Sequence, residues 1–217
     1  MTVAQDPNEL FDVVTWDGKP TGIQKRRADV HRDGDWHQAI HIWVMGRDHD
    51  GEFLILQRRS MAKDTSPGML DPTVGGHLGA GESIEVALRE AQEEIGITIL
   101  PANVAYAGSR RAVNEEPGVC DRELQQVYFH RRDEPLDTYR PNPAELDALV
   151  RVAIIDVLRI FRGERTHAPV EVLDATTLET GHASASRQDL SRSFDRYLYR
   201  VAIAARQFLD GEDYFSV

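Results

Sequence analysis

The sequence predicts an α+β fold in which a mixed β-sheet lies between helices, with a further helix near the C-terminal end. Three observations support this prediction. Two apolar runs, 38–45 and 52–58, flank turn-forming residues at 48–51, which is typical of a β-hairpin. An amphipathic helix is expected at 84–95, and strand-like and helix-like segments alternate after it. This order favours a sheet covered by helices.

The remaining elements are assigned from local patterns in chain order. Residues 9–16 are expected to form a strand that stops at the turn Asp17-Gly18, whereas residues 22–37 are expected to be polar and irregular. The segment 60–75 contains Pro67 and Pro72 and is expected to form a loop. Further strands are expected at 103–109, 124–130 and 147–154, followed by a short helix that ends at residue 162.

The C-terminal part is expected to consist of a polar loop, 164–187, and a helix, 188–210. The helix is predicted because apolar residues recur at helical spacing, namely Phe194, Leu198, Val201, Ala205 and Phe208. We expect this helix to pack on the same domain, with a dimer contact or a lid as the alternatives. The chain then divides into an N-terminal segment 1–35 that packs on the central domain, the central domain 36–164, and a loop-and-helix extension 165–217.

Charge and composition exclude several classes of protein. The net charge of −11 argues against a broad nucleic-acid-binding surface, because such surfaces use Lys and Arg to neutralise phosphates. The single cysteine, Cys120, excludes an internal disulfide and a multi-cysteine zinc site. The first residues lack the pattern of a secretion signal, and no apolar run approaches the roughly 18 residues of a membrane span. We therefore expect a cytoplasmic protein without nucleic-acid or membrane partners.

Three carboxylates cluster on the helix expected at 84–95. Glu90, Glu93 and Glu94 are spaced i, i+3 and i+4, so they share about 100° of one helix face. The opposite face is apolar, with Ile84, Leu88, Ala91 and Ile95. Like charges at this spacing repel one another. A divalent cation with oxygen ligands, such as Mg²⁺, would offset that repulsion.

The segment 76–97 resembles the Nudix box, whose pattern is Gly, five residues, Glu, seven residues, then Arg-Glu-apolar-x-Glu-Glu-x-Gly-apolar. The matching residues are Gly76, Glu82, Arg89, Glu90, Glu93, Glu94, Gly96 and Ile97. Only six residues separate Glu82 from Arg89, so the box is one residue shorter than the pattern. The family pairs this Glu with this Arg, and the short spacing makes Glu85, four residues before Arg89, an alternative partner.

The resemblance implies the Nudix α/β/α sandwich and the metal-dependent hydrolysis of a diphosphate linkage in a small molecule. The implied catalytic residues are Arg89, Glu90, Glu93 and Glu94, and the implied metal ligands are Glu90, Glu93, Glu94, the carbonyl of Gly76, and Glu123. The implied cofactor is Mg²⁺, with Mn²⁺ as the alternative, and a homodimer is a further expectation. Three basic residues before the box, Arg58, Arg59 and Lys63, are candidates for phosphate contacts, with a solvated basic loop as the alternative.

A second set of residues is similar to the isopentenyl-diphosphate isomerase branch of the same superfamily. The similarity covers about residues 10–155 and includes Phe11-Asp12, the run 37–44 and the run 56–59. In those isomerases three histidines and two acids hold a metal. The corresponding residues here are His37, His77, Asp121 and Glu123, with His31 at a spacing one residue short.

The position of the isomerase catalytic cysteine is occupied by Gly75, which offers no acid–base group. We therefore expect a hydrolase on an isomerase-like scaffold, with a possible second metal site at His37, His77 and Asp121. The alternatives are an isomerase of allylic diphosphates and a nucleotide-binding Nudix module without turnover.

Overall fold

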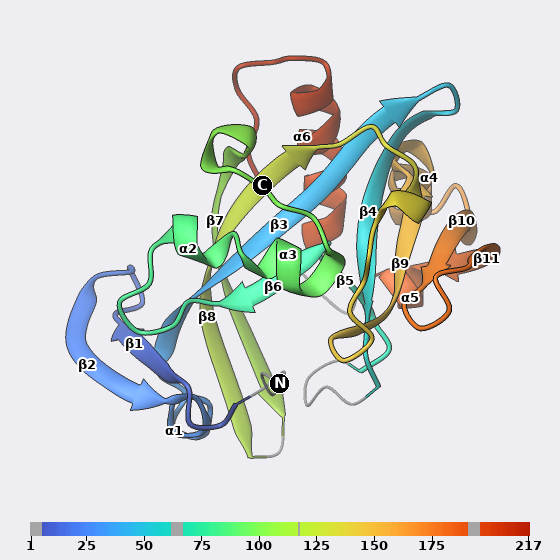
Figure 1. Ribbon diagram of the computed structural model, residues 1–217. Helices are drawn as coiled ribbons and strands as arrows, with labels where there is room; N and C mark the ends of the chain where they lie inside the picture. Colours follow the sequence, from blue (N-terminus) through green and yellow to red (C-terminus); the bar gives the residue numbers. More distant parts are fainter. Residues whose placement is uncertain (1–5, 62–66, 117, 191–195) are drawn as a thin grey trace.

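Figure 1 shows the computed structural model of the protein, which describes residues 6–61, 67–116, 118–190 and 196–217. The strands are β1 (Leu10–Val14), β2 (Pro20–Arg26), β3 (Trp36–Asp48), β4 (Gly51–Arg59), β5 (Leu70–Asp71), β6 (Val74–His77), β7 (Ala105–Glu116), β8 (Val119–Arg131), β9 (Leu146–Ala153), β10 (His167–Asp174) and β11 (Thr180–Ser186). The helices are α1 (Arg27–Asp33), α2 (Ile84–Ala87), α3 (Glu90–Ile95), α4 (Ile154–Phe161), α5 (Arg187–Leu190) and α6 (Tyr197–Leu209), with 3₁₀ turns at Pro101–Asn103 and Leu136–Thr138.

These strands form one mixed sheet with β3 near its centre. The main order is β11-β10-β9-β4-β3-β1-β2, and β6 and β8 also pair with β3. The β3–β8 pairing is parallel and places His37 opposite Glu123. The β3–β6 pairing is antiparallel and places His41 opposite Gly75. Because β3 takes partners from four parts of the chain, it brings the residues of the candidate site together.

Apolar residues fill both faces of the sheet. On one face Trp43 and Phe129 pack in a core with α4 and α6, and on the other face Ile40 and Ile42 pack in a core with the α2–α3 segment. Alternate residues of β3 therefore enter different cores, as the two-residue period of a strand requires. The sheet lies between helices (Figure 1), which confirms the predicted α+β sandwich.

Two predictions about the polar segments are wrong. Residues 22–37 are not irregular, because β2 pairs with β1 and α1 follows it. Residues 164–187 are not a loop, because β10 and β11 form a hairpin that continues the sheet beside β9. Strands β2 and β11 are almost wholly exposed. They therefore lack the apolar alternation from which strands are predicted.

Other elements are longer or more interrupted than expected. Strands β7 and β8 extend well beyond 103–109 and 124–130, and the end of the expected loop at 60–75 contains the short strand β5 and the start of β6. The C-terminal helix begins at Tyr197 and packs in the same core as α4, as predicted for Leu198, Val201, Ala205 and Phe208. Phe194 lies outside the described residues.

The box helix consists of two pieces joined at Leu88 and Arg89. The backbone N–H of Arg89 bonds to the carbonyl of Val86, and that of Ala91 bonds to Leu88. These i to i+3 bonds are those of a 3₁₀ turn, which advances farther per residue than an α-helix. This turn lies at the end of the segment in which the box is one residue shorter than the family pattern. The second piece ends at Gly96, whose φ of 74° lies in the left-handed region that favours glycine.

Candidate active site

The glycine-rich loop between β6 and α2 is held by the N-terminal strand. The N–H of Ala80 donates to the carbonyl of Leu10 at 2.7 Å, and the N–H of Gly81 donates to the carboxylate of Asp12 at 2.7 Å. The N–H of Gly79 donates to Glu82 at 2.9 Å. Three backbone N–H groups therefore hold the loop that precedes the box glutamates. Two of their acceptors lie on β1, so this strand helps to position the loop.

Arg89 lies at the centre of the acidic residues of the box. Its guanidinium nitrogens lie 2.8 Å from Glu82, 3.3 Å from Glu90 and 3.5 Å from Glu93. The Glu82–Arg89 ion pair therefore forms despite the short spacing. The exposed Glu85 side chain instead bonds to Ser83. Arg89 thus neutralises part of the charge that the clustered carboxylates would otherwise build up.

The three box glutamates occupy different environments. Glu94 is buried, and its Oε2 accepts from the N–H of Gly75 at 3.3 Å and from the amide of Gln57 at 3.4 Å. Glu93 is half exposed. Burial raises the pKa of Glu90 to about 7, against the opposing charge of Arg89. Burial therefore favours the protonated form of Glu90 more than that of an exposed carboxyl group.

The backbone at Gly76 lies directly against Glu90. A Cβ at Gly76 would lie 3.0 Å from Cγ and 3.1 Å from Cδ of Glu90. Glycine at this position thus permits the close approach of the carboxylate to the backbone. Glu90, Glu93, Glu94 and the carbonyl of Gly76 are all oxygen donors, the type that Mg²⁺ prefers. Among the described residues, however, the three glutamates do not bring their carboxylate oxygens within 4.8 Å of one another.

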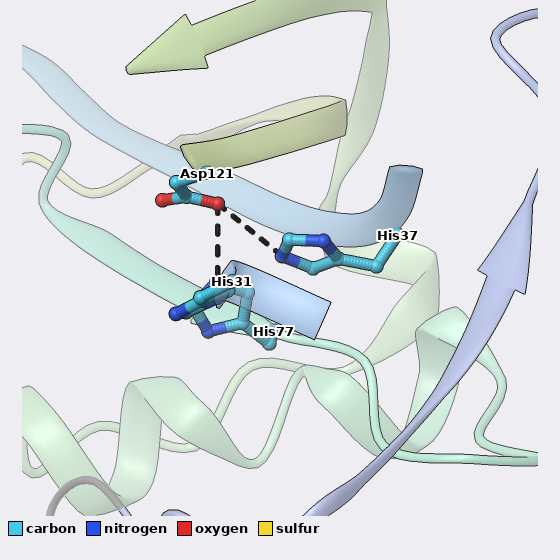
Figure 2. A group of neighbouring side chains, drawn as sticks. All are labelled: His31, His37, His77 and Asp121. Atoms are coloured by element: carbon cyan, nitrogen blue, oxygen red, sulfur yellow. Dashed lines mark ion pairs between the residues drawn. The ribbon is translucent and has the colours of Figure 1, made fainter. Parts of the chain in front are cut away.

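Figure 2 shows a second cluster, made by His31, His37, His77 and Asp121. One ligand atom from each of these residues lies within 4.8 Å of those of the others. Oδ1 of Asp121 is 3.4 Å from Nε2 of His37 and 3.7 Å from Nε2 of His31. The residues come from β3, β8, α1 and the end of β6, so four segments distant in sequence meet at one point.

The chemistry of this cluster fits a divalent metal. Nδ1 of His37 faces the carbonyl of Asp35 at 3.1 Å, the usual outer contact of a metal-binding histidine. Its Nε2 has no hydrogen-bond partner among the described residues. Burial lowers the pKa of His37 to about 4, and nearby His77 adds to this effect. A neutral imidazole beside a carboxylate is a suitable ligand set for zinc, manganese or iron.

His77 and Glu123 form a buried pair at the edge of the cluster. Nε2 of His77 lies 2.9 Å from Oε1 of Glu123, and Arg27 lies 3.1 Å from Nδ1 of His77. Because Arg only donates, it occupies Nδ1 of His77, and Nε2 is the ring nitrogen that faces Glu123. Burial alone would raise the pKa of Glu123, but the contact with His77 holds it well below its usual value. Glu123 thus lies with the histidines.

Gly75 separates the two groups of residues. Its N–H contacts Glu94 of the box, and its Cα faces the ring of His41. A Cβ at this position would meet no atom closer than 3.7 Å. A Cβ is therefore tolerated at Gly75 in ordinary contact with His41 and Gln57. Burial lowers the pKa of His41 to about 4, so this buried ring is neutral at pH 7.

The predicted phosphate contacts lie at the end of β4. Arg59 pairs with Asp71 at 3.1 Å and is largely buried, whereas Arg58 is half-buried in the same strand. Lys63 lies outside the described residues. Arg58 and Arg59 therefore remain candidates for substrate contacts.

Sequence patterns did not identify several residues that line the site. Arg27 contacts His77, and Phe11 stacks on His37 and His77 with ring centroids 5.2 Å and 4.9 Å apart. Tyr197 of α6 contacts His41. The His37–His41 spacing on one strand was a usable indication for His41, whereas the other contacts join segments that are distant in sequence.

A pocket of about 490 Å³ opens beside the box helix. Its lining includes Tyr106 and Tyr128, whose ring centroids are 5.4 Å apart, together with Gln38 and Glu82. Because Glu82 also pairs with Arg89, the pocket adjoins the acidic cluster. Two aromatic rings beside polar side chains suit a planar polar group.

Comparisons with known proteins agree with this geometry. The model of the NUDIX domain family matches residues 35–172. The chain is 34% identical over 156 residues to an uncharacterized Nudix hydrolase of Clostridium acetobutylicum, which covers 70% of this chain and 74% of the relative. It is 29% identical over 164 residues to an isopentenyl-diphosphate Delta-isomerase of Shigella dysenteriae, which covers 75% of this chain and 87% of that protein.

A solved structure from Deinococcus radiodurans has a similar fold, with a TM-score of 0.51 and 22% identity, over 71% of this chain and 90% of that one. Among the described residues, no helix is both long enough and apolar enough to cross a membrane. The box residues around Arg89 and the match over most of the chain lead to the same assignment. The chain belongs to the Nudix family, and its relatives include the isopentenyl-diphosphate isomerases.

Proposed function

We propose that this protein is a metal-dependent hydrolase that cleaves the diphosphate linkage between a nucleoside diphosphate and another moiety. The observation that carries the proposal is the arrangement of Glu90, Glu93 and Glu94 on one helical segment, with Arg89 between the acids and Gly76 against Glu90. Membership of the Nudix family supports the reaction class.

The box residues would hold Mg²⁺, with Mn²⁺ as the alternative. The ligands would be Glu90, Glu93, Glu94 and the carbonyl of Gly76. The bound cation would neutralise charge on the diphosphate. Arg89 keeps Glu90 and Glu93 oriented, and Glu90 accepts a proton from water when it is ionised. Glu123 is the alternative base and metal ligand, and Arg58 and Arg59 would contact phosphate.

The histidine cluster supports a second metal site. His37, His77 and Asp121, with His31, supply nitrogen and oxygen donors within 4.8 Å of one another. We propose that these residues bind a transition metal that is distinct from the Mg²⁺ of the box. The measurement is the metal content of the purified protein, and His37→Ala should lose that metal while Glu93→Gln retains it.

An isomerase of allylic diphosphates is the second candidate function, and the histidine cluster is the observation that favours it. The named isomerases among the relatives are consistent with it. Gly75 argues against it, because no acid–base side chain stands there. Conversion of isopentenyl diphosphate by the purified protein would establish this candidate. No conversion, with hydrolysis of another diphosphate, would exclude it.

The deciding experiment is the release of phosphate or nucleoside monophosphate from a panel of diphosphates with Mg²⁺. Glu94→Gln should reduce turnover by about 100-fold or more, because it removes a ligand charge. Glu164→Gln is the matched control, since this exposed side chain follows α4 and does not line the pocket beside the box. Binding of a nucleotide without turnover would instead support a nucleotide-binding module. Homodimerisation and a cytoplasmic location stay predictions, which light scattering and cell fractionation would test.

A further inference from the structure

Strand β8 presents a row of polar side chains on the face of the sheet where the histidine cluster lies. Asp121, Glu123 and Gln125 are spaced two residues apart, so they point to the same face. Asp121 belongs to the histidine cluster. The next residues on that face, Val127 and Phe129, enter the apolar core. Gln125 is therefore the polar residue of β8 that lies between the histidine cluster and this core.

Gln125 is buried, and each end of its amide has a partner. Its Oε1 accepts from Nη1 of Arg110 at 2.7 Å, and its Nε2 donates to Oε2 of Glu123. Arg110 lies directly opposite Gln125 in the antiparallel β7–β8 pairing. A buried amide that lost one of these partners would leave a polar group without compensation, which costs free energy. Both bonds therefore favour one arrangement of the side chain.

The two partners also determine which way the amide is turned. A guanidinium group only donates, so the amide oxygen of Gln125 must face Arg110. The NH₂ group then faces Glu123, whose ionised carboxylate only accepts. A reversed amide would place donor against donor at Arg110 and acceptor against acceptor at Glu123. Gln125 thus offers a hydrogen-bond donor to Glu123.

Arg110 is held in place by the C-terminal helix. The guanidinium carbon of Arg110 lies 4.0 Å from the ring centroid of Tyr197, the first residue of α6. This distance is within the range of a cation–π contact, and Tyr197 is buried. The donor that orients Gln125 therefore comes from a side chain that is packed between β7 and α6.

The two oxygens of Glu123 face different partners. Oε2 accepts from Gln125, whereas Oε1 lies 2.9 Å from Nε2 of His77. His37 lies opposite Glu123 in the parallel β3–β8 pairing, and both histidines belong to the cluster. Because Oε2 is held by the amide, Oε1 stays on the side of the histidines. The bond from Gln125 therefore sets the orientation of the carboxylate.

A fixed carboxylate at this position matters for the binding of a metal. Hydrogen bonds from outside the ligand set orient the ligands of a metal, and loss of such a bond lowers metal affinity by about 10- to 100-fold. Gln125 makes a bond of this kind to Glu123. An apolar residue in its place would remove the donor to Oε2, and the carboxylate could turn away from His77.

We propose that Gln125 is a positioning residue of the histidine cluster, whose amide is oriented by Arg110 and fixes the carboxylate of Glu123 with Oε1 toward the metal proposed there. The inference rests on the second metal site of the proposed function. It concerns the strength and geometry of metal binding, so its tests do not depend on hydrolysis at the box.

The first test is calorimetric titration of the metal-depleted full-length protein with Zn²⁺ in excess Mg²⁺. Mg²⁺ occupies oxygen-donor sites, whereas imidazole ligands favour Zn²⁺. His37→Ala identifies the heat that belongs to the histidine cluster. Gln125→Met, which keeps the length of the side chain but removes its amide, should weaken this binding about tenfold.

Gln126→Met is the matched control for this titration. Gln126 is the next residue of β8, so it points to the opposite face of the sheet. Its Oε1 accepts from the hydroxyl of Tyr106 at 3.2 Å. Gln126→Met should therefore keep the wild-type affinity for Zn²⁺.

The outcomes of the titration separate the inference from the proposed metal site. Equal Zn²⁺ affinities in the wild type and Gln125→Met would overturn the role of Gln125 and leave the metal site in place. No binding at the histidine cluster of the wild type would overturn both. Hydrolysis at the box is decided by the separate phosphate-release assay.

The second test is the visible absorption of Co²⁺ bound at the histidine cluster, which distinguishes positioning from a general loss of stability. This absorption depends on the ligands of the metal and on their geometry. At saturating Co²⁺, Gln125→Met should shift the absorption bands, whereas Gln126→Met should match the wild type. Bands that stay unchanged in Gln125→Met would show that Glu123 keeps its orientation without the amide, and the proposal would fail.

The third test needs no substitution, so poor folding of a variant cannot obscure it. The side-chain NH₂ signals of Gln125 and Gln126 are assigned by triple-resonance NMR of the wild type. Saturation with Zn²⁺ should shift the Gln125 signals, because the metal draws charge from the carboxylate that accepts them, and should leave those of Gln126 in place. Gln125 signals that do not move would count against the proposal.

Discussion

The carboxylate of Glu82 lies 2.8 Å from the guanidinium of Arg89, although the segment between them is one residue shorter than the family pattern. A 3₁₀ turn at Leu88 and Arg89 lies in this segment. Glu82 also accepts the N–H of Gly79. The pair therefore connects the glycine-rich loop to the helix that carries the acids.

Loss of this pair should impair catalysis more than folding. Glu82→Gln should reduce kcat/KM by about tenfold, because Arg89 would no longer be held in the position that orients Glu90 and Glu93. Glu164→Gln, at an exposed residue that does not line the pocket, should have the kinetics of the wild type. Steady-state assays and thermal unfolding of both variants test this. Equal kinetics in the two variants would show that the Glu82–Arg89 pair has no role in turnover.

The neighbouring glycines Gly75 and Gly76 should respond differently to alanine. Gly76→Ala should weaken Mg²⁺ binding about tenfold, because the new Cβ would lie 3.0 Å from Glu90 and displace its carboxylate. Gly75→Ala should leave Mg²⁺ binding unchanged, since its Cβ finds only ordinary contacts. Calorimetric titration with Mg²⁺ measures both. Similar affinities in the two variants would contradict the assignment of Glu90 as a ligand.

Mg²⁺ binding should strengthen as the pH rises through 7. Burial raises the pKa of Glu90 to about 7, so the carboxyl is protonated below this pH and the cation must displace the proton. Calorimetry at pH 6.5 in two buffers of different ionisation enthalpy should detect proton release. Glu90→Gln should abolish that release. Affinity that stays constant from pH 6 to 8 would rule out this coupling.

The metal-free protein should lose stability in acid through His41. Burial lowers the pKa of His41 to about 4 from the usual 6.5. Between these values the unfolded chain binds more protons than the folded one, so the free energy of unfolding falls as the pH drops from 6.5 to 4. The loss from this ring is on the order of 3 kcal/mol.

Urea unfolding at pH 7.5, 5.5 and 4.5 in the presence of a chelator measures this effect. His41→Gln should show a smaller loss in acid than the wild type, whereas His49→Gln, which removes an exposed ring, should behave as the wild type does. The same acid dependence in all three proteins would show that His41 is protonated without cost in the folded state.

The box was predictable from sequence because its chemistry lies within one short segment. Glu90, Glu93 and Glu94 share a helix face at fixed spacing, and the acids could be recognised without knowledge of the rest of the fold. The hairpin of β3 and β4 was predictable for a related reason, since both strands are apolar and flank a clear turn.

The remaining parts of the fold depend on contacts that sequence spacing does not reveal. Strand β11 has an exposed polar sequence and is a strand only because β10 pairs with it. Arg27 meets His77 from 50 residues away, and Tyr197 meets His41 from 156 residues away. Tertiary packing alone makes these residues neighbours.

The parallel pairing of β3 with β8 also affects how quickly the site can assemble. His37 and Glu123 face each other across strands that are joined by 70 intervening residues. Closing so long a segment of chain carries a large entropic cost before any contact is gained. Folds rich in such distant contacts fold slowly, in milliseconds to seconds. The local hairpin of β3 and β4 is expected to form early, and the histidine cluster is expected to appear only in the last folding step, when β8 docks.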